Sequence, residues 1–201
     1  MAAVECLICQ TTEALVRLSV QELVDCVAGD CICVEGGCNI YGGYKECAFY
    51  YIQKRGIGLA DYYPLVYQTQ PCAAKPGGGR VRYHIDGFVR MPFNVFDESN
   101  LKRVVARRPV VVTISVGHKF LGYREGIYKD EDFGDPRRET HSVLVVGYGT
   151  LDGEDFWLIK NSHGPDWGMS GYGRILRNSG LRYDICGILK KPAYPVIKSI
   201  I

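Results

Sequence analysis

The first third of the chain carries apolar residues at helical spacing. Near the N-terminus, Val4, Leu7, Ile8 and Leu15 recur about every 3.6 residues, which predicts a helix with one buried face over residues 2–16. No Ser, Thr, Asp or Asn precedes this stretch, although such residues normally satisfy the first free amides of a helix. We therefore expect the chain to enter this helix in its middle.

Two shorter helices are predicted on either side of a loop rich in Gly and Cys. Ser19 followed by Glu22 has the spacing of a capping box, which predicts a helix over Val20–Cys26. The other helix is expected over Lys45–Lys54. The glycines between them permit main-chain conformations that let a ligand or a strand come close.

From residue 80 onward the pattern changes to strands. The predicted strands are 81–89, 109–116, 126–128, 141–148, 156–161 and 171–176. A helix over Glu98–Arg107, with Leu101, Val104 and Val105 on one face, interrupts them. A helical first part followed by a mostly antiparallel second part is an α+β arrangement. We expect one domain over residues 1–79 and a second over 80–201.

Composition narrows the classes of partner. Hydrophobic residues make up 47% and charged residues 23% of the chain, as in ordinary globular proteins, and a formal charge of +2 gives no electrostatic reason to propose nucleic acid. Apolar runs stop short of the roughly 18 residues that span a bilayer, and no export signal is visible. We expect neither nucleic acid nor a membrane as partner.

The chain contains nine cysteines, a density that favours an oxidising compartment. The odd number leaves at least one cysteine free or paired between chains. Cys31, Cys33 and Cys38 are clustered, but their spacing is poor for zinc and the nearest histidine, His84, lies far along the sequence. Disulfides or free thiols are favoured over a metal site, and no metal is expected.

One pair of residues offers chemistry. His141 begins an apolar strand and Asn161 ends the next one, 20 residues later. If the two strands form a hairpin, the carboxamide can orient the imidazole. That is the base and orienting half of a nucleophilic site, whose third member would be a thiol or hydroxyl from elsewhere in the fold.

Several segments resemble one family, and the likeness runs nearly end to end. The segments are LSVQELVDC at 18–26, GCN at 37–39, GGY at 42–44, YP at 63–64, HSVLVVGYG at 141–149, KNSHGPDWGMSGYGRI at 160–175, CGI at 186–188 and AYPV at 193–196. They resemble LSEQELVDC, GCNGGY, YPY, HAVxxVGYG, KNSWGxxWGExGYxRI, CGI and ASYPV of the papain-like cysteine proteases. This resemblance implies a two-lobe α+β fold, with a helical N-terminal lobe, here incomplete, and an antiparallel β-barrel-like C-terminal lobe.

The resemblance also implies roles for individual residues. His141 would be the catalytic base and Asn161 its orienting partner, while Cys26 and Cys72 would form a disulfide. The residues expected to contact a peptide substrate are Gly42, Gly43, Tyr44, Thr113 and Ser142. Turn formation alone explains Gly42 and Gly43 equally well.

The family also suggests partners and a compartment. It implies a peptide or protein substrate, a cystatin-like inhibitor and no cofactor. If the chain is made from a longer precursor, the resemblance implies a lysosomal, vacuolar or extracellular location.

The nucleophile segment of the family has no counterpart here. In the family it reads CGxCWAF at the start of a long helix, after a Gln that helps to stabilise the oxyanion. Ala3-Val4-Glu5 matches the middle of that helix. We therefore expect the chain to start after the nucleophile.

Cys6 and Cys9 are the alternatives for the nucleophile. They lie 135 and 132 residues before His141, within the roughly 130–150 expected of papain-like enzymes. Neither is followed by Trp, and the register set by residues 18–26 puts Cys6 about 11 residues, or roughly 16 Å of helix, beyond the missing thiol. We expect neither to replace it.

Further departures surround the base. His163 stands where the family has a Trp that covers the Asn–His contact, and Thr140 stands where it has Asp or Asn. A second imidazole beside His141 could compete as its partner. Cys38 and Cys186 lack their expected disulfide partners, which makes them candidate free thiols.

Three hypotheses follow. The first is a papain-like endopeptidase homologue that is proteolytically inactive as this chain. The second is a non-catalytic module that binds a peptide or an inhibitor in the remaining cleft. The third is an incomplete product that does not fold alone.

Overall fold

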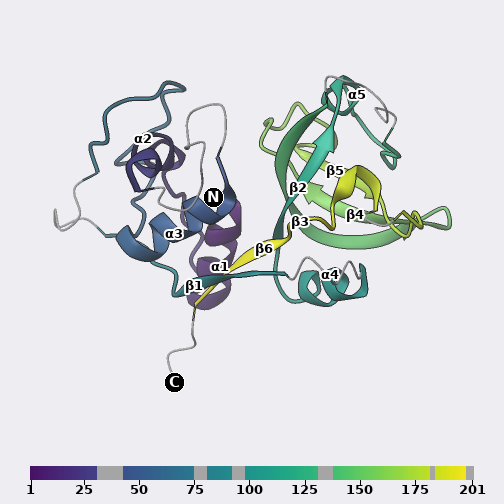
Figure 1. Ribbon diagram of the computed structural model, residues 1–201, viewed down its shortest axis with the longest axis horizontal. Helices are drawn as coiled ribbons and strands as arrows, with labels where there is room; N and C mark the ends of the chain where they lie inside the picture. The colour runs from purple at the N-terminus through teal and green to yellow at the C-terminus, as the bar shows by residue number, and fades with distance from the viewer. Residues whose placement is uncertain (31–42, 75–80, 92–97, 131–137, 182–183, 198–201) are drawn as a thin grey trace. The chain divides into compact units, whose positions relative to one another are not determined.

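The computed structural model describes residues 1–30, 43–74, 81–91, 98–130, 138–181 and 184–197. In chain order its elements are α1 (Ala2–Thr12), α2 (Val20–Asp30), α3 (Lys45–Arg55), β1 (Gly87–Arg90), α4 (Glu98–Val105), β2 (Val110–Val116), α5 (His118–Leu121), β3 (Glu139–Leu151), β4 (Glu154–Lys160), β5 (Tyr172–Leu176), the 3₁₀ turn η1 (Ile185–Gly187) and β6 (Ala193–Val196) (Figure 1). Two compact units form, a helical unit of Met1–Val89 with Pro195–Ile201 and a sheet unit of Arg90–Tyr194.

Helix α1 begins as predicted and ends earlier than predicted. It buries Val4, Leu7 and Ile8 of the predicted face together with Ala3, and no side chain caps its first turn. The prediction is wrong for Leu15, which lies beyond the helix and is 81% exposed. At Glu13 the backbone turns left-handed, with φ of 60°, and the Glu13 N–H donates to a carbonyl of the last turn. This conformation is a common way to end a helix, and it stops α1 short of residue 16.

Helix α2 has half of the predicted capping box. The backbone N–H of Glu22 donates to Oγ of Ser19 at 2.9 Å, as an N-cap requires. The return bond is absent, because the Ser19 N–H donates to the carbonyl of Gly58 at 2.9 Å instead. The helix also continues to Asp30, past the predicted end at Cys26.

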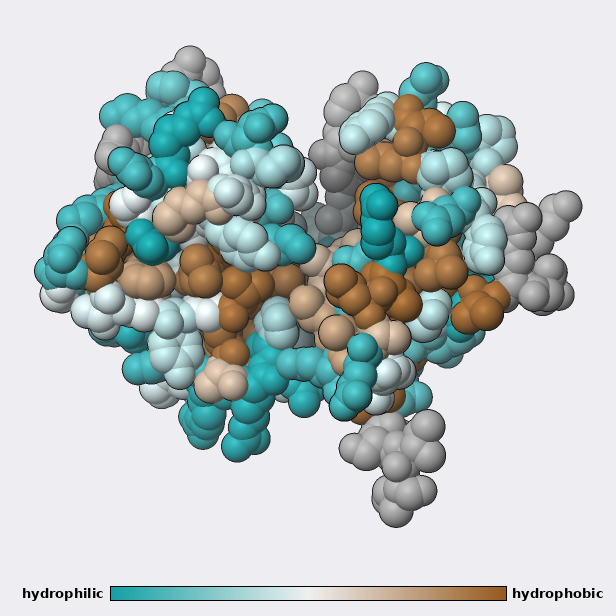
Figure 2. Space-filling view, turned by 180° about the vertical axis from the view of Figure 1, so that it is seen from behind, coloured by the Kyte–Doolittle hydropathy of each residue, from teal (hydrophilic) through white to brown (hydrophobic). Residues whose placement is uncertain are grey.

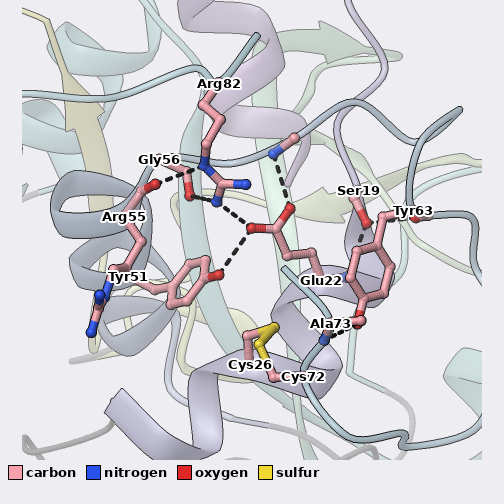
Figure 3. Close-up of polar contacts among 11 residues, drawn as sticks. Ser19, Glu22, Cys26, Tyr51, Arg55, Gly56, Tyr63, Cys72, Ala73 and Arg82 are labelled. Atoms are coloured by element: carbon pink, nitrogen blue, oxygen red, sulfur yellow. Dashed lines mark hydrogen bonds and ion pairs between the residues drawn. A yellow bond between two sulfur atoms is a disulfide. The ribbon is translucent and has the colours of Figure 1, made fainter. Parts of the chain in front are cut away.

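The Glu22 carboxylate is instead the centre of a buried polar network (Figure 3). It accepts hydrogen bonds from the Gly58 N–H at 3.0 Å and the Tyr51 hydroxyl at 2.9 Å, and it pairs with Arg82. Burial, and then the Glu22 charge, raise the pKa of the Tyr51 hydroxyl above its ordinary range. An unpaired buried charge is costly, so these partners stabilise the Glu22 carboxylate. The network also connects α2 to α3 and to the segment at Arg82.

The disulfide implied by the resemblance is present beside this network (Figure 3). It joins Cys26 of α2 to Cys72, 46 residues later. Tyr63 is connected to the same region, because its hydroxyl donates to Asp25 at 2.8 Å. The segment after α3 is thus held against α2 by covalent and polar bonds.

The strands form one open sheet in the order β1-β6-β2-β3-β4-β5. The pairs from β2 to β5 are antiparallel, so the predicted α+β class is confirmed. The sheet of this barrel-like part is not closed into a barrel, since β1 and β5 are separate edges of the described sheet. No helix of the described residues is long and apolar enough to cross a bilayer.

Two predicted strands are shorter than expected. Of residues 81–89, only the last three belong to β1, while Tyr83 forms an isolated bridge with Ile57. In place of the predicted strand at 126–128, the structure has an isolated bridge between Tyr128 and Ile175. Elements that the pattern missed, α5, η1 and β6, are each three or four residues long, too short to show a period.

Strand β2 explains where the core of the sheet unit lies. Its side chains alternate, with Val110, Val112, Ile114 and Val116 buried. They pack with buried residues of the other strands, including Trp157, and each such side chain contributes about 1.5–3 kcal/mol. The surface mixes hydrophobic and hydrophilic residues, as Figure 2 shows for one face.

Strand β3 contains a bulge on its β4 side. Val145 pairs with Ile159 and Gly147 pairs with Leu158, so one extra residue is accommodated at Val146. A bulge of this kind bends the strand and shifts the register of everything beyond it.

Candidate active site

The two hairpin residues singled out from the sequence lie close together. His141 sits in β3 opposite Ile114 of β2, and Asn161 directly follows β4. The backbone N–H of Asn161 donates to the carbonyl of Gly171 at 2.9 Å, and its side chain is only 8% exposed. The pairing of β3 with β2 fixes the backbone of His141, and the bond to Gly171 fixes that of Asn161.

The side chains of His141 and Asn161 are hydrogen-bonded, with 2.7 Å between Nε2 and Oδ1. The backbone N–H of Ser162 donates to the same Asn161 atom at 2.8 Å. Since a backbone N–H can only donate, that atom is the amide oxygen, and His141 must carry a proton on Nε2. In the neutral imidazole, Nδ1 then bears the lone pair, which makes it the nitrogen that can act as a base.

Aromatic rings pack around the imidazole. The His163 ring centre lies 5.0 Å from that of His141, and Phe120 lies 6.5 Å away on the same measure. Trp167 packs against His163 with 6.2 Å between ring centres, and its indole N–H donates to the Phe120 carbonyl at 3.1 Å. Phe120 was not anticipated, because a four-residue helix such as α5 has no sequence period.

His163 titrates differently from an ordinary histidine. Its side chain is solvent-exposed, but packing against its neighbours removes part of its hydration. This loss of hydration, and then the nearby His141, lower the pKa of His163. The imidazole that replaces the family's Trp is therefore biased toward its neutral form.

The residues expected to contact a substrate are placed as follows. Thr113 and Ser142 are direct partners across β2 and β3, and Ser142 is exposed. Gly43 and Tyr44 precede α3 in the helical unit, and both are exposed. Gly42 lies outside the described residues.

The thiols are distributed over both units. Cys6 and Cys9 are half-buried on α1, and Cys186, the one cysteine within residues 90–194, is buried in η1. In the described part of the chain, the hydrogen-bond partner of the His141 ring is Asn161 and not a sulfur. The cluster at residues 31–38 lies outside the described residues, and within them no group of three or more His, Cys, Asp or Glu could hold a metal ion.

Comparison with known families decides the ancestry of this site. Residues 1–196 match the papain family of cysteine proteases. The chain belongs to this papain family. Both the hairpin and the segment at α2 thus lie inside one continuous match, and the predicted family is confirmed.

Curated relatives are plant papain-family proteases. Vignain of Phaseolus vulgaris is 40% identical over 191 residues, which cover 94% of this chain and 49% of vignain. Cysteine proteinase EP-B 1 of Hordeum vulgare is 40% identical over 191 residues, which cover 92% of this chain and 48% of that protein. The chain therefore spans about half the length of the curated relatives it matches.

Solved papain-family structures share the fold. The Carica candamarcensis protease CMS1MS2 in complex with E-64 is 34% identical with a TM-score of 0.80, covering 98% of this chain and 85% of that one. Bromelain from Ananas comosus in complex with the E64 inhibitor is 28% identical with a TM-score of 0.83, covering 98% and 86%. The Amb a 11 ragweed pollen protease in its proform is 33% identical with a TM-score of 0.80, covering 98% and 57%.

Proposed function

We propose that His141 and Asn161 are the base and the orienting residue of a thiol acyl-transfer site, and that this 201-residue chain does not cleave peptides by itself. The observation that carries the first part is the 2.7 Å bond between His141 Nε2 and Asn161 Oδ1. Because Ser162 fixes the direction of the amide, the bond leaves Nδ1 of His141 to exchange protons.

The chemistry would run through a thiol supplied from outside these residues. The thiol proton moves to His141 Nδ1 while sulfur bonds to the peptide carbonyl carbon. The imidazolium then gives that proton to the leaving amine as the C–N bond breaks. Water, deprotonated by the same nitrogen, releases the acyl group and restores the thiol.

The cysteines of this chain support the second part of the proposal. Cys186, the one cysteine of the sheet unit, is only 4% exposed. Cys6 and Cys9 lie within α1 and lack the CGxCW context. None of the three combines the sequence context and exposure that a papain-family nucleophile has.

A thiol-directed peptidase probe on the purified 201-residue chain tests the proposal. We expect no cysteine whose labelling depends on His141, so that wild type, His141→Ala and the matched control His118→Ala label alike. Labelling at a single cysteine that disappears in His141→Ala and persists in His118→Ala would overturn the inactivity.

A second candidate is binding without catalysis. Ser142 and Tyr44, both expected to contact substrate, remain exposed, and solved relatives carry E-64 or are proforms. We propose peptides and a cystatin-like inhibitor as ligands. Saturable binding that Ser142→Trp weakens would support this function, whereas a sample that melts cooperatively but shows no saturable binding would end it.

A further inference from the structure

His141 has a second imidazole within reach. His163 comes two residues after Asn161, and its ring centre is 5.0 Å from that of His141, with an angle of 59° between the planes. The sheet unit contains both residues, so their separation is set within one compact unit. The family resemblance assigns no chemistry to a histidine at position 163.

The separation matches that of two imidazoles sharing one ion. Histidine nitrogens bind zinc at about 2.0–2.1 Å, and tetrahedral angles then put the two ring centres about 5 Å apart. The two planes can take many angles about the metal, so the observed tilt is compatible with coordination. Small adjustments of the His163 side chain are available because it is solvent-exposed.

His141 is already held in the manner of a metal ligand. Metal-binding histidines usually donate their other ring N–H to a carbonyl or carboxylate, which fixes the tautomer and the ring orientation. The Nε2–H of His141 donates to Asn161 Oδ1 at 2.7 Å. Nδ1 therefore carries the lone pair, and the bond to Asn161 already fixes the orientation of the ring.

The Asn161 carboxamide also contains a buried donor close to this contact. Among the residues that the structure describes, its Nδ2 is buried and has no hydrogen-bond partner, which is rare for an amide donor. This donor shares a carboxamide with the oxygen bonded to His141.

We propose that His141 and His163 form a two-imidazole site for a divalent transition ion of the zinc, nickel or copper class, with water completing the coordination. Imidazole nitrogen suits these ions, whereas magnesium and calcium prefer oxygen ligands. The ion occupies Nδ1 of His141, the nitrogen that a base would need. The site stands independently of the proposed function, since binding requires neither a nucleophile nor a substrate.

Titration with Ni²⁺ alone, followed by tryptophan fluorescence, tests the site. A paramagnetic ion at His163 quenches Trp167, whose ring centre is 6.2 Å from that of His163. We expect saturable quenching that diamagnetic Zn²⁺ reverses by competition. Removing either ligand with His163→Gln or His141→Gln should weaken binding at least tenfold, and Asn161→Ala, which removes the orienting bond, by about 10–100-fold.

His118→Gln is the matched control, since His118 is another exposed histidine of the same unit. Its quenching curve should coincide with that of wild type. Equal midpoints in wild type, His163→Gln and His141→Gln would overturn the site, as would quenching that never saturates. Circular dichroism of each variant, unchanged from wild type, separates a lost ligand from a lost fold.

Discussion

At the scale of single residues, Asn161 is the residue that organises the site. Its backbone N–H is bonded to Gly171, and its side-chain oxygen accepts from both Ser162 and His141. Three hydrogen bonds at a position that is 8% exposed leave the carboxamide little freedom. The imidazole is therefore oriented by a group that is itself fixed by the backbone.

The pKa of His163 provides a residue-scale prediction. By NMR titration of its ring protons, we expect a pKa below the ordinary value of about 6.5. In His141→Gln the pKa should rise, because a neighbouring positive charge is removed, but it should stay below 6.5 because the loss of hydration is the larger cause.

The sign of this shift has a consequence for stability. The unfolded chain binds the proton more readily than the folded one, so His163 destabilises the fold as the pH falls from about 6.5 through its lowered pKa. A His163 pKa at or above 6.5 in wild type would contradict the prediction, and His118→Gln should leave it unchanged.

At the scale of elements, sequence period predicted long elements well and short ones poorly. Strands β2 to β5 and helices α1, α3 and α4 appear near their expected positions, because their apolar faces are buried. Strand β6 was missed because it has four residues and contains Pro195. Residues 81–86 read as a strand, but in the described part of the chain they make only scattered backbone contacts, a bridge from Tyr83 to Ile57 and a bond from the Asp86 N–H to the Val196 carbonyl.

Side-chain contacts likewise differ in how far the sequence predicts them. The meeting of His141 and Asn161 was predictable, because it needs only a hairpin with the expected pairing. The role of Glu22 was predicted as a cap and differs, since its partner Arg82 is 60 residues away in sequence. A pattern read over a few neighbouring residues cannot predict a partner so far away in the sequence.

The buried pair of Glu22 and Arg82 gives a prediction at this scale. The two side chains are 1% and 14% exposed, and Arg82 also donates to the carbonyl of Arg55 at 2.8 Å. Arg82→Met leaves the Glu22 charge buried without its partner, so urea unfolding should show a loss of about 3–5 kcal/mol.

An exposed ion pair offers the comparison. Lys129 and Glu154 are 2.6 Å apart, with side chains 49% and 46% exposed. Lys129→Met should therefore change the free energy of unfolding by no more than about 1 kcal/mol. Similar losses in the two variants would mean that burial of the Glu22 network does not control its contribution.

At the scale of the whole molecule, the two units carry different optical probes. Both tryptophans, Trp157 and Trp167, belong to the sheet unit, whereas α1, α2 and α3 belong to the helical unit. Tryptophan fluorescence thus follows the sheet unit, and far-ultraviolet circular dichroism is weighted toward the helical unit.

The disulfide allows the two units to be tested separately. Replacing Cys26 and Cys72 together by Ala opens a link across 46 residues and should cost about 2–4 kcal/mol. We expect the urea midpoint followed by circular dichroism to fall more than the midpoint followed by fluorescence. Equal shifts in the two midpoints would show instead that the units unfold as one cooperative system.

The bulge at Val146 has a consequence for how such sites are recognised in sequences. Within the part of β3 that pairs with β4, Val146 is the residue without a regular partner. A relative without the bulge, or with a longer turn after Leu151, could keep the same two side chains in contact at a different sequence spacing. A search for homologous sites should therefore align the paired strands and let the interval between the two residues vary.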